Sequence, residues 1–123
     1  MTEYLFTYTR AQAIEDGVLV DVSETAREAG FTIPVAVTDT VWNEYVEPDD
    51  QAKKWGQGAS GRLWDVVWIA RIGAKCNANA SDFLFTVRMV MKEKQPSDIQ
   101  FKAMIHGGDN GEPVITITMP NED

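Results

Sequence analysis

The chain has 123 residues, of which 44% are hydrophobic and 24% are charged, a composition typical of one globular domain over residues 1–123. A single cysteine, Cys76, excludes an internal disulfide and favours a reducing compartment. No apolar run approaches the roughly 18 residues that span a bilayer, and the first residues lack the basic and apolar regions of a signal peptide. The sequence therefore predicts a small cytoplasmic domain without membrane association.

The formal net charge of −8 comes from the first part of the chain. Residues 1–50 contain eleven acids and two arginines, whereas residues 51–123 contain nine bases and eight acids. Binding to nucleic-acid phosphates needs clustered lysine and arginine, so direct nucleic-acid binding is not expected. An acidic surface attracts basic protein surfaces instead, although acids also serve simply to keep a small protein soluble.

Two short helices are expected in the first part of the chain. Thr9 suits the N-cap of a helix over residues 10–16, and Gly17 suits the left-handed position after it. Residues 18–22 are apolar and β-branched, which favours a short buried strand. Residues 23–30 are typical of a second helix, with a serine cap, acids in the first turn and a glycine stop.

A third helix is expected over residues 39–47, where four apolar residues fall at helical spacing before Pro48. Residues 48–61 include three closely spaced glycines and are expected to form a loop. The main helix is expected over residues 62–75. Its residues form two neighbouring stripes, which are Leu63, Val66, Val67 and Ala70 in one and Trp64, Trp68, Arg71 and Lys75 in the other.

The hydrophobic period changes from about 3.6 to 2 after Ser81, which predicts strands over residues 83–91, 99–106 and 114–119. Short connections make these strands an antiparallel meander. The expected fold class is α+β, with short N-terminal helices and one longer tryptophan-rich helix packed on a C-terminal antiparallel sheet of three or slightly more strands. The expected core contains Leu63, Val67, Phe85, Val87, Phe101 and Ile117, anchored by the four tryptophans Trp42, Trp55, Trp64 and Trp68.

Few residues offer catalytic or metal-binding chemistry. Nucleophilic catalysis needs a histidine beside a nucleophile, and the only histidine, His106, lies thirty residues from Cys76. One histidine and one cysteine do not supply the ligands of a usual zinc site. Asp65, next to Trp64, is the best candidate for a general acid. An acid in the first turn that interacts with the helix dipole is the better interpretation of this residue. We therefore expect no catalytic residue, no metal and no cofactor.

Four stretches carry a resemblance to known sequences: TRAQAIEDGVLVDVSETAREAG over residues 9–30, IPVAVT over 33–38, GRLWDV over 61–66 and GEPVITI over 111–117. Together they resemble a family of small uncharacterised proteins carried by bacterial phages, plasmids and integrated mobile elements. The resemblance covers most of residues 8–119. It implies an accessory role in a mobile element and supplies no catalytic residue.

The leading hypothesis is a non-enzymatic accessory protein that binds a basic surface of a host or element-encoded protein through an acidic face. Its sharper form is an anti-defence inhibitor, such as an anti-CRISPR or anti-restriction protein, whose carboxylates occupy the place of nucleic-acid phosphates. The alternatives are a small enzyme or enzyme subunit, and a regulatory partner in the element's own machinery. The expected protein-binding residues are five acids in a stretch without a base: Asp39, Glu44, Glu47, Asp49 and Asp50.

Overall fold

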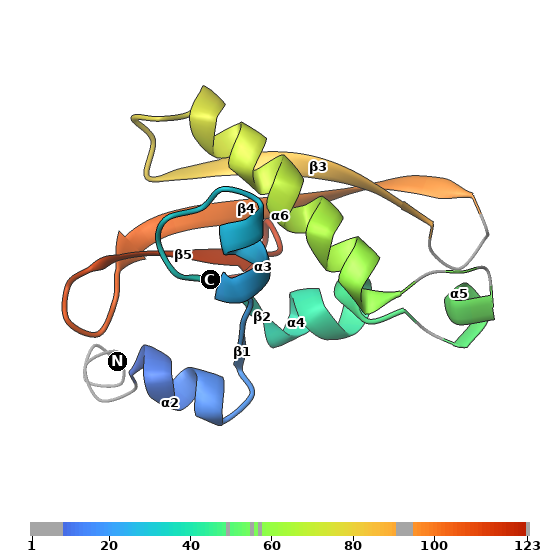
Figure 1. Cartoon of the computed structure of the whole chain (residues 1–123), viewed down its shortest axis with the longest axis horizontal. Coiled ribbons are helices and arrows are strands. Elements are labelled where there is room, and N and C mark those ends of the chain that lie inside the picture. Colours follow the sequence, from blue (N-terminus) through green and yellow to red (C-terminus); the bar gives the residue numbers. More distant parts are fainter. Residues whose placement is uncertain (1–8, 49, 55, 57, 91–94, 123) are drawn as a thin grey trace.

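The strands of the computed structural model, which describes residues 9–48, 50–54, 56, 58–90 and 95–122, form one mixed sheet (Figure 1). The strand order is β1-β2-β5-β4-β3. The strands are β1 (Leu19–Asp21), β2 (Val35–Thr38), β3 (Asp82–Val90), β4 (Pro96–Gly107) and β5 (Pro113–Thr118).

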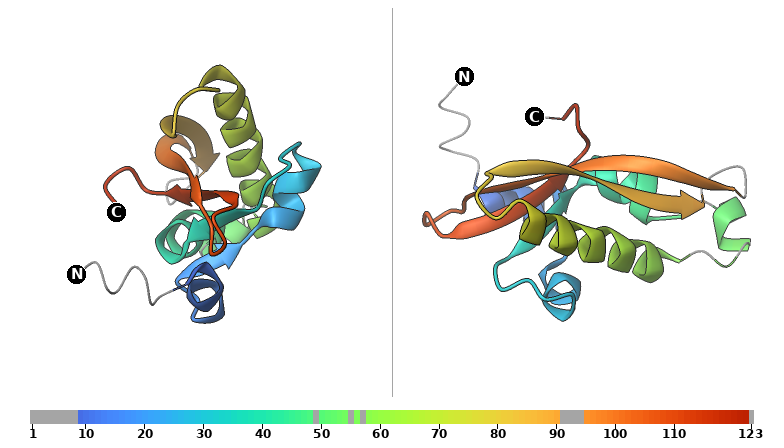
Figure 2. Two further views of the ribbon diagram at one scale, coloured as in Figure 1. Left: turned by 90° about the vertical axis from the view of Figure 1, so that its left-hand side faces the viewer. Right: turned by 90° about the horizontal axis from the view of Figure 1, so that it is seen from above.

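Two helices, α3 and α6, lie side by side on one face of this sheet (Figure 2). The described helices are α2 (Arg10–Glu15), α3 (Ser23–Glu28), α4 (Asp39–Val41), the π-helix η1 (Trp42–Val46), α5 (Asp50–Lys54) and α6 (Ala59–Cys76). None of the helices in the described residues is both long enough and apolar enough to cross a membrane. The α+β class is therefore confirmed, with α6 as the main helix.

The antiparallel meander of β3, β4 and β5 is confirmed, but the expectation of a purely antiparallel sheet is wrong. On its other side β5 pairs in parallel with β2, with Val35 opposite Ile115 and Val37 opposite Ile117. Strand β1 then pairs antiparallel with β2. Four residues are too few to show a strand period, and the parallel partner lies far away in the sequence, so β2 was not predicted.

The first helix begins where the sequence predicts. The backbone N–H of Gln12 donates to the Thr9 hydroxyl (3.0 Å), and the Thr9 N–H donates to the Gln12 side chain (2.9 Å), which completes a capping box. After the helix, Gly17 has a φ of 80°, a left-handed conformation that glycine adopts without a steric penalty.

Ser23 does not cap α3 as expected. It is the first helical residue, and its hydroxyl donates to Asp21 Oδ1 (2.6 Å). The Ser23 hydroxyl oxygen in turn accepts from the backbone N–H of Val35 (3.0 Å). Ser23 therefore ties the end of β1 to the start of β2, and the short first strand is fixed at the sheet edge.

Two helical boundaries differ from the sequence prediction. The third helix is α-helical only as far as Val41 and continues as η1, and the backbone N–H of Glu47 donates to the carbonyl of Trp42 (2.7 Å). A hydrogen bond between residues five positions apart is the one that defines a π-helix. Residues 50–54, expected in a loop, form α5, and α6 begins at Ala59, earlier than expected, with Gly61 inside the helix.

The hydrophobic core lies between the sheet and the helices α3 and α6. Phe101 of β4 is fully buried, with its ring stacked on Phe85 (centroids 5.6 Å apart) and edge-on to Tyr45 (centroids 5.7 Å apart). In β3 buried and exposed residues alternate, whereas the central strand β5 is buried on both faces from Val114 onward. The predicted core residues are all buried: Leu63, Val67, Phe85, Val87, Phe101 and Ile117.

Two contacts fix the position of α6. A Cβ atom added to Gly73 would lie 2.5 Å from the ring of Phe83, so the missing side chain permits close approach of α6 to β3. The guanidinium of Arg62, on a residue only 4% exposed, donates to the backbone carbonyls of Tyr45 and Val90. Arg62 thus connects α6 to the end of η1 and to the end of β3.

Candidate functional site

The predicted acids that the structure describes lie on or next to α4, η1 and α5, and they differ in burial and in their partners. Asp39 is half-buried as the first residue of α4, and its carboxylate accepts from the backbone N–H of Thr40 (2.8 Å). Glu44 is exposed on η1, and Asp50 is exposed at the start of α5. Asp49 lies outside the described residues.

Glu47 differs from the other acids because its charge is partly compensated. It follows the last residue of η1 and has an extended conformation, so it does not stack one helical turn above Glu44. Its carboxylate lies 3.6 Å from the ammonium of Lys53 on α5. Both groups are about half exposed, so this ion pair adds little stability, but it lowers the local negative potential.

Large apolar side chains gather on the outer side of α6 instead. The expectation that the tryptophans anchor the core is wrong for Trp64 and Trp68, which are 37% and 45% exposed, and Ile72 is 46% exposed. The two indoles stack, with ring centroids 5.7 Å apart and an interplanar angle of 18°. These three residues follow one another at intervals of four, and we call them the α6 stripe.

The other two tryptophans have different places. Trp42 is partly buried and packs against the core from η1, in agreement with the expectation. Trp55 lies outside the described residues. One side of α6 packs on β3 through the other predicted stripe of Leu63, Val66, Val67 and Ala70. One helix cannot press both stripes against the same sheet, so the second stripe faces outward.

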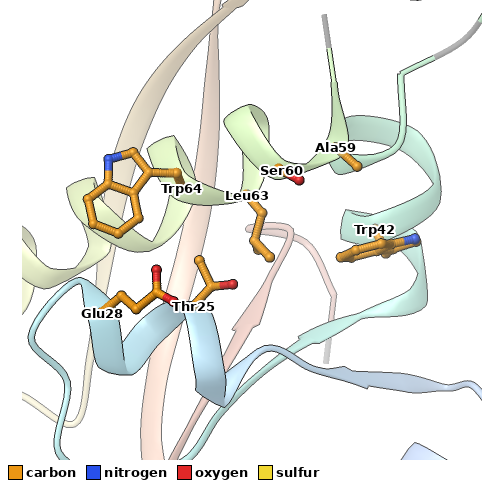
Figure 3. Close-up of a pocket in the computed structure, with 7 residues that line it drawn as sticks. All are labelled: Thr25, Glu28, Trp42, Ala59, Ser60, Leu63 and Trp64. Carbon is orange, nitrogen blue, oxygen red and sulfur yellow. The ribbon is translucent and has the colours of Figure 1, made fainter.

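A groove adjoins the start of the α6 stripe (Figure 3). It has a volume of about 420 Å³, is open to solvent and is lined by residues of three elements. Figure 3 shows Trp64 and Glu28 at one end and Trp42 at the other, with Leu63 between them. The lining residues are Thr25 and Glu28 from α3, Trp42 from η1, and Ala59, Ser60, Leu63 and Trp64 from α6.

Of the lining residues that the structure describes, Glu28 alone is charged, and it is exposed. Within the part of the chain that the structure describes, its carboxylate has no ion-pair or hydrogen-bond partner. Glu24, one turn earlier on α3, and Asp65, next to Trp64, are also exposed. The indole of Trp64 therefore shares the groove with a negative charge, an arrangement suited to an apolar ligand that carries positive charge.

A second polar cluster joins α2 to the sheet. Arg10 Nη1 donates to the hydroxyl of Thr116 (2.8 Å), and His106 Nε2 lies 2.7 Å from the same hydroxyl. The carboxylate of Asp109 accepts from the backbone N–H of Arg10 (2.6 Å). Burial lowers the pKa of Arg10, and the carboxylates of Asp21, Asp109 and Glu112 oppose this shift. These contacts hold α2 against β5.

The other chemically reactive candidates lie apart. Cys76 is exposed at the last residue of α6, whereas His106 is near the end of β4, and Asp65 is exposed on α6. Among the described residues there is no group of three or more histidine, cysteine, aspartate or glutamate side chains placed to hold a metal ion. The groove and the α6 stripe are therefore the strongest candidate site.

The comparison with protein families gives one match. The model of a family described as a family of unknown function (DUF6573) matches residues 1–123. The chain belongs to this family. Neither the curated proteins nor the solved structures include a match to the chain.

Sequence analysis did not predict the groove, because its residues come from three separate elements. Thr25 and Glu28 meet Trp42 and Leu63 only after α3, η1 and α6 have packed together. The α6 stripe did leave a signal in the sequence. Two stripes with large apolar side chains on one helix exceed what a single contact with a sheet can bury. The tryptophans of the stripe that also includes Arg71 and Lys75 are the exposed ones.

Proposed function

We propose that this protein is a non-enzymatic binding protein that attaches to a basic surface of another protein through the outer side of α6. The exposed, stacked pair of Trp64 and Trp68 is the observation that carries the proposal. Contiguous exposed apolar residues are uncommon on soluble proteins and mark contact sites, and tryptophan is enriched among residues that dominate binding energy.

Charge supports a basic partner. The formal net charge is −8, and the groove beside the α6 stripe presents Glu28 with no cation among its described lining residues. Glu44 adds an exposed negative charge on η1, and Asp50 adds another at the start of α5. Opposite charges on two proteins accelerate their encounter, whereas a well-packed aromatic centre slows their dissociation. The acids thus steer the partner and the α6 stripe holds it.

The finer form of the proposal places the protein among the accessory factors of phages, plasmids or integrated elements. A small acidic protein that covers the nucleic-acid-binding surface of a host defence protein would act as an anti-CRISPR or anti-restriction inhibitor. Support for this form comes from the small size of the chain, its negative charge and the sequence resemblance described above. A basic regulatory partner encoded by the same element fits the same surface.

Affinity capture with matched variants tests the proposal. The tagged chain and a Trp68→Ala, Ile72→Ala variant are used to capture proteins from a lysate of the source organism, and the captured partner is identified and purified. We expect the double variant to bind the purified partner at least about thirtyfold more weakly. The control is Leu84→Ala, which removes an equally exposed leucine from β3, outside the α6 stripe.

The result that would contradict the proposed site is equal affinity of the wild-type chain and the double variant for the partner. Because all substituted side chains are exposed, the variants should keep the circular dichroism spectrum of the wild type. A partner that is acidic, or whose affinity does not fall as salt is raised, would contradict the charge part of the proposal.

A further inference from the structure

We infer that the groove between α3, η1 and α6 receives a lysine or arginine side chain of the partner, an inference that rests on the proposed function. The groove lies next to the first indole of the α6 stripe, since Trp64 belongs to both. A partner seated on the stripe would therefore bring its own side chains over the groove. The residues that line the groove determine which of these side chains fits.

The charged end of the groove selects a cation. Among the described residues that line the groove only Glu28 is ionisable, and no described residue pairs with its carboxylate. The Glu28 carboxylate would repel an anionic side chain at this end of the groove. A guanidinium or ammonium group would form a charge-assisted hydrogen bond, which strengthens when the partner excludes water from the groove.

The indole of Trp64 adds a second source of selectivity. Figure 3 shows its ring and the carboxylate of Glu28 at the same end of the groove, with the edge of the ring turned toward Glu28. A cation bound by the Glu28 carboxylate would lie beside the indole and could stack on its ring, and tryptophan is the best aromatic partner for a cation. The geometry therefore favours a guanidinium, which is planar and stacks on an indole while it donates in its own plane.

The remainder of the groove suits the hydrocarbon stem of such a side chain. Leu63 and Ala59 supply apolar contact beyond the charged end, and Trp42 closes the far end. Long basic side chains pack their methylene groups on apolar surface while the charged end contacts polar groups. A volume of about 420 Å³ accommodates one such side chain together with an apolar neighbour.

The test uses short peptides as probes of the groove. Acetyl-Leu-Arg-Leu-amide and its citrulline counterpart, which has the same shape without the charge, are titrated separately into the isotope-labelled full chain. Binding is followed by the NMR signals of the indole and backbone N–H groups. We expect the arginine peptide to shift the signals of Trp42, Trp64 and Thr25, and the citrulline peptide to bind about tenfold more weakly.

Two charge variants separate the groove from general surface attraction. Glu28→Gln removes the charge inside the groove, whereas Glu24→Gln removes one from the same helix without altering a lining residue. We expect an affinity loss of about tenfold for the first and less than about twofold for the second. Equal losses for both variants, or equal binding of both peptides, would overturn the inference.

The two proposals fail in different ways. If Trp68→Ala, Ile72→Ala abolishes partner binding while Glu28→Gln leaves both partner and peptide affinity unchanged, the binding face stands and the assignment of the groove is wrong. If the arginine peptide binds as expected but the partner is insensitive to the double variant, the groove stands and the stripe is not the contact site.

Discussion

At the scale of single residues, Phe101 shows how the core holds the sheet to the helices. Its ring is fully buried and contacts the rings of Phe85 on β3 and Tyr45 on η1. We expect Phe101→Ala to lower the free energy of unfolding by about 3–5 kcal/mol, because both the buried area and the packing around it are lost. Urea unfolding measures this value. The exposed control Leu84→Ala should change it by no more than about 0.5 kcal/mol, and a similar loss for both would show that Phe101 is not central to the core.

Gly73 gives a prediction in which two effects oppose each other. Replacing a helical glycine by alanine usually stabilises a helix by about 1 kcal/mol. Here the new methyl group would lie 2.5 Å from a ring atom of the buried Phe83, and overpacking a core costs about 1–3 kcal/mol. We expect Gly73→Ala to lower the melting temperature despite its better helix propensity. A control, Gly61→Ala, meets no atom within 4 Å in the same helix and should raise it. A higher melting temperature for both variants would show that α6 can move away from β3.

At the scale of elements, the acids on η1 and α5 can be separated from the helix that carries the stripe. We expect reversal of Glu44, Glu47 and Asp50 to lysine to slow association with the basic partner by about tenfold or more at low salt, since it replaces attraction by repulsion. The salt dependence of the association rate should weaken. The fold should persist, because the Glu47–Lys53 ion pair that is lost is an exposed one. Stopped-flow mixing at two salt concentrations measures the rates.

If the partner associates with the reversed variant as fast as with the wild type at low salt, these acids only solvate the surface. The dissociation rate gives a further distinction within the same experiment. Acids that act by steering leave it nearly unchanged, whereas loss of the α6 stripe should raise it.

The elements that the sequence predicts correctly are those stabilised by nearby residues. The capping box at Thr9 and the alternation along β3 involve neighbours a few positions apart, so local patterns reveal them. The π-helix η1 has almost the same apolar spacing as an α-helix, so the sequence pattern does not distinguish the two. The short strand β2 owes its structure to β5, and the groove at Glu28 to three elements, so neither is visible before the fold is known.

At the scale of the whole molecule, the mixed sheet joins two parts of different character. The antiparallel meander of β3, β4 and β5 follows from short connections, and α6 covers its apolar face. The pair of β1 and β2 comes from the acidic first part of the chain and is added through one parallel contact. Residues of the groove from both parts, such as Glu28 and Trp64, therefore come together only in the complete fold.

The position of β5 also determines how this chain can misfold. It follows all the other described strands in the sequence, yet it lies between β2 and β4 in the sheet. Before it is inserted, the molecule holds two separate two-stranded ribbons, which are marginally stable by themselves, and pairing of distant segments is slow. During this interval the inner edges of β2 and β4 are open to strands of other molecules. A polypeptide that stops before Pro113 would keep both edges open permanently and should aggregate rather than fold as a smaller domain.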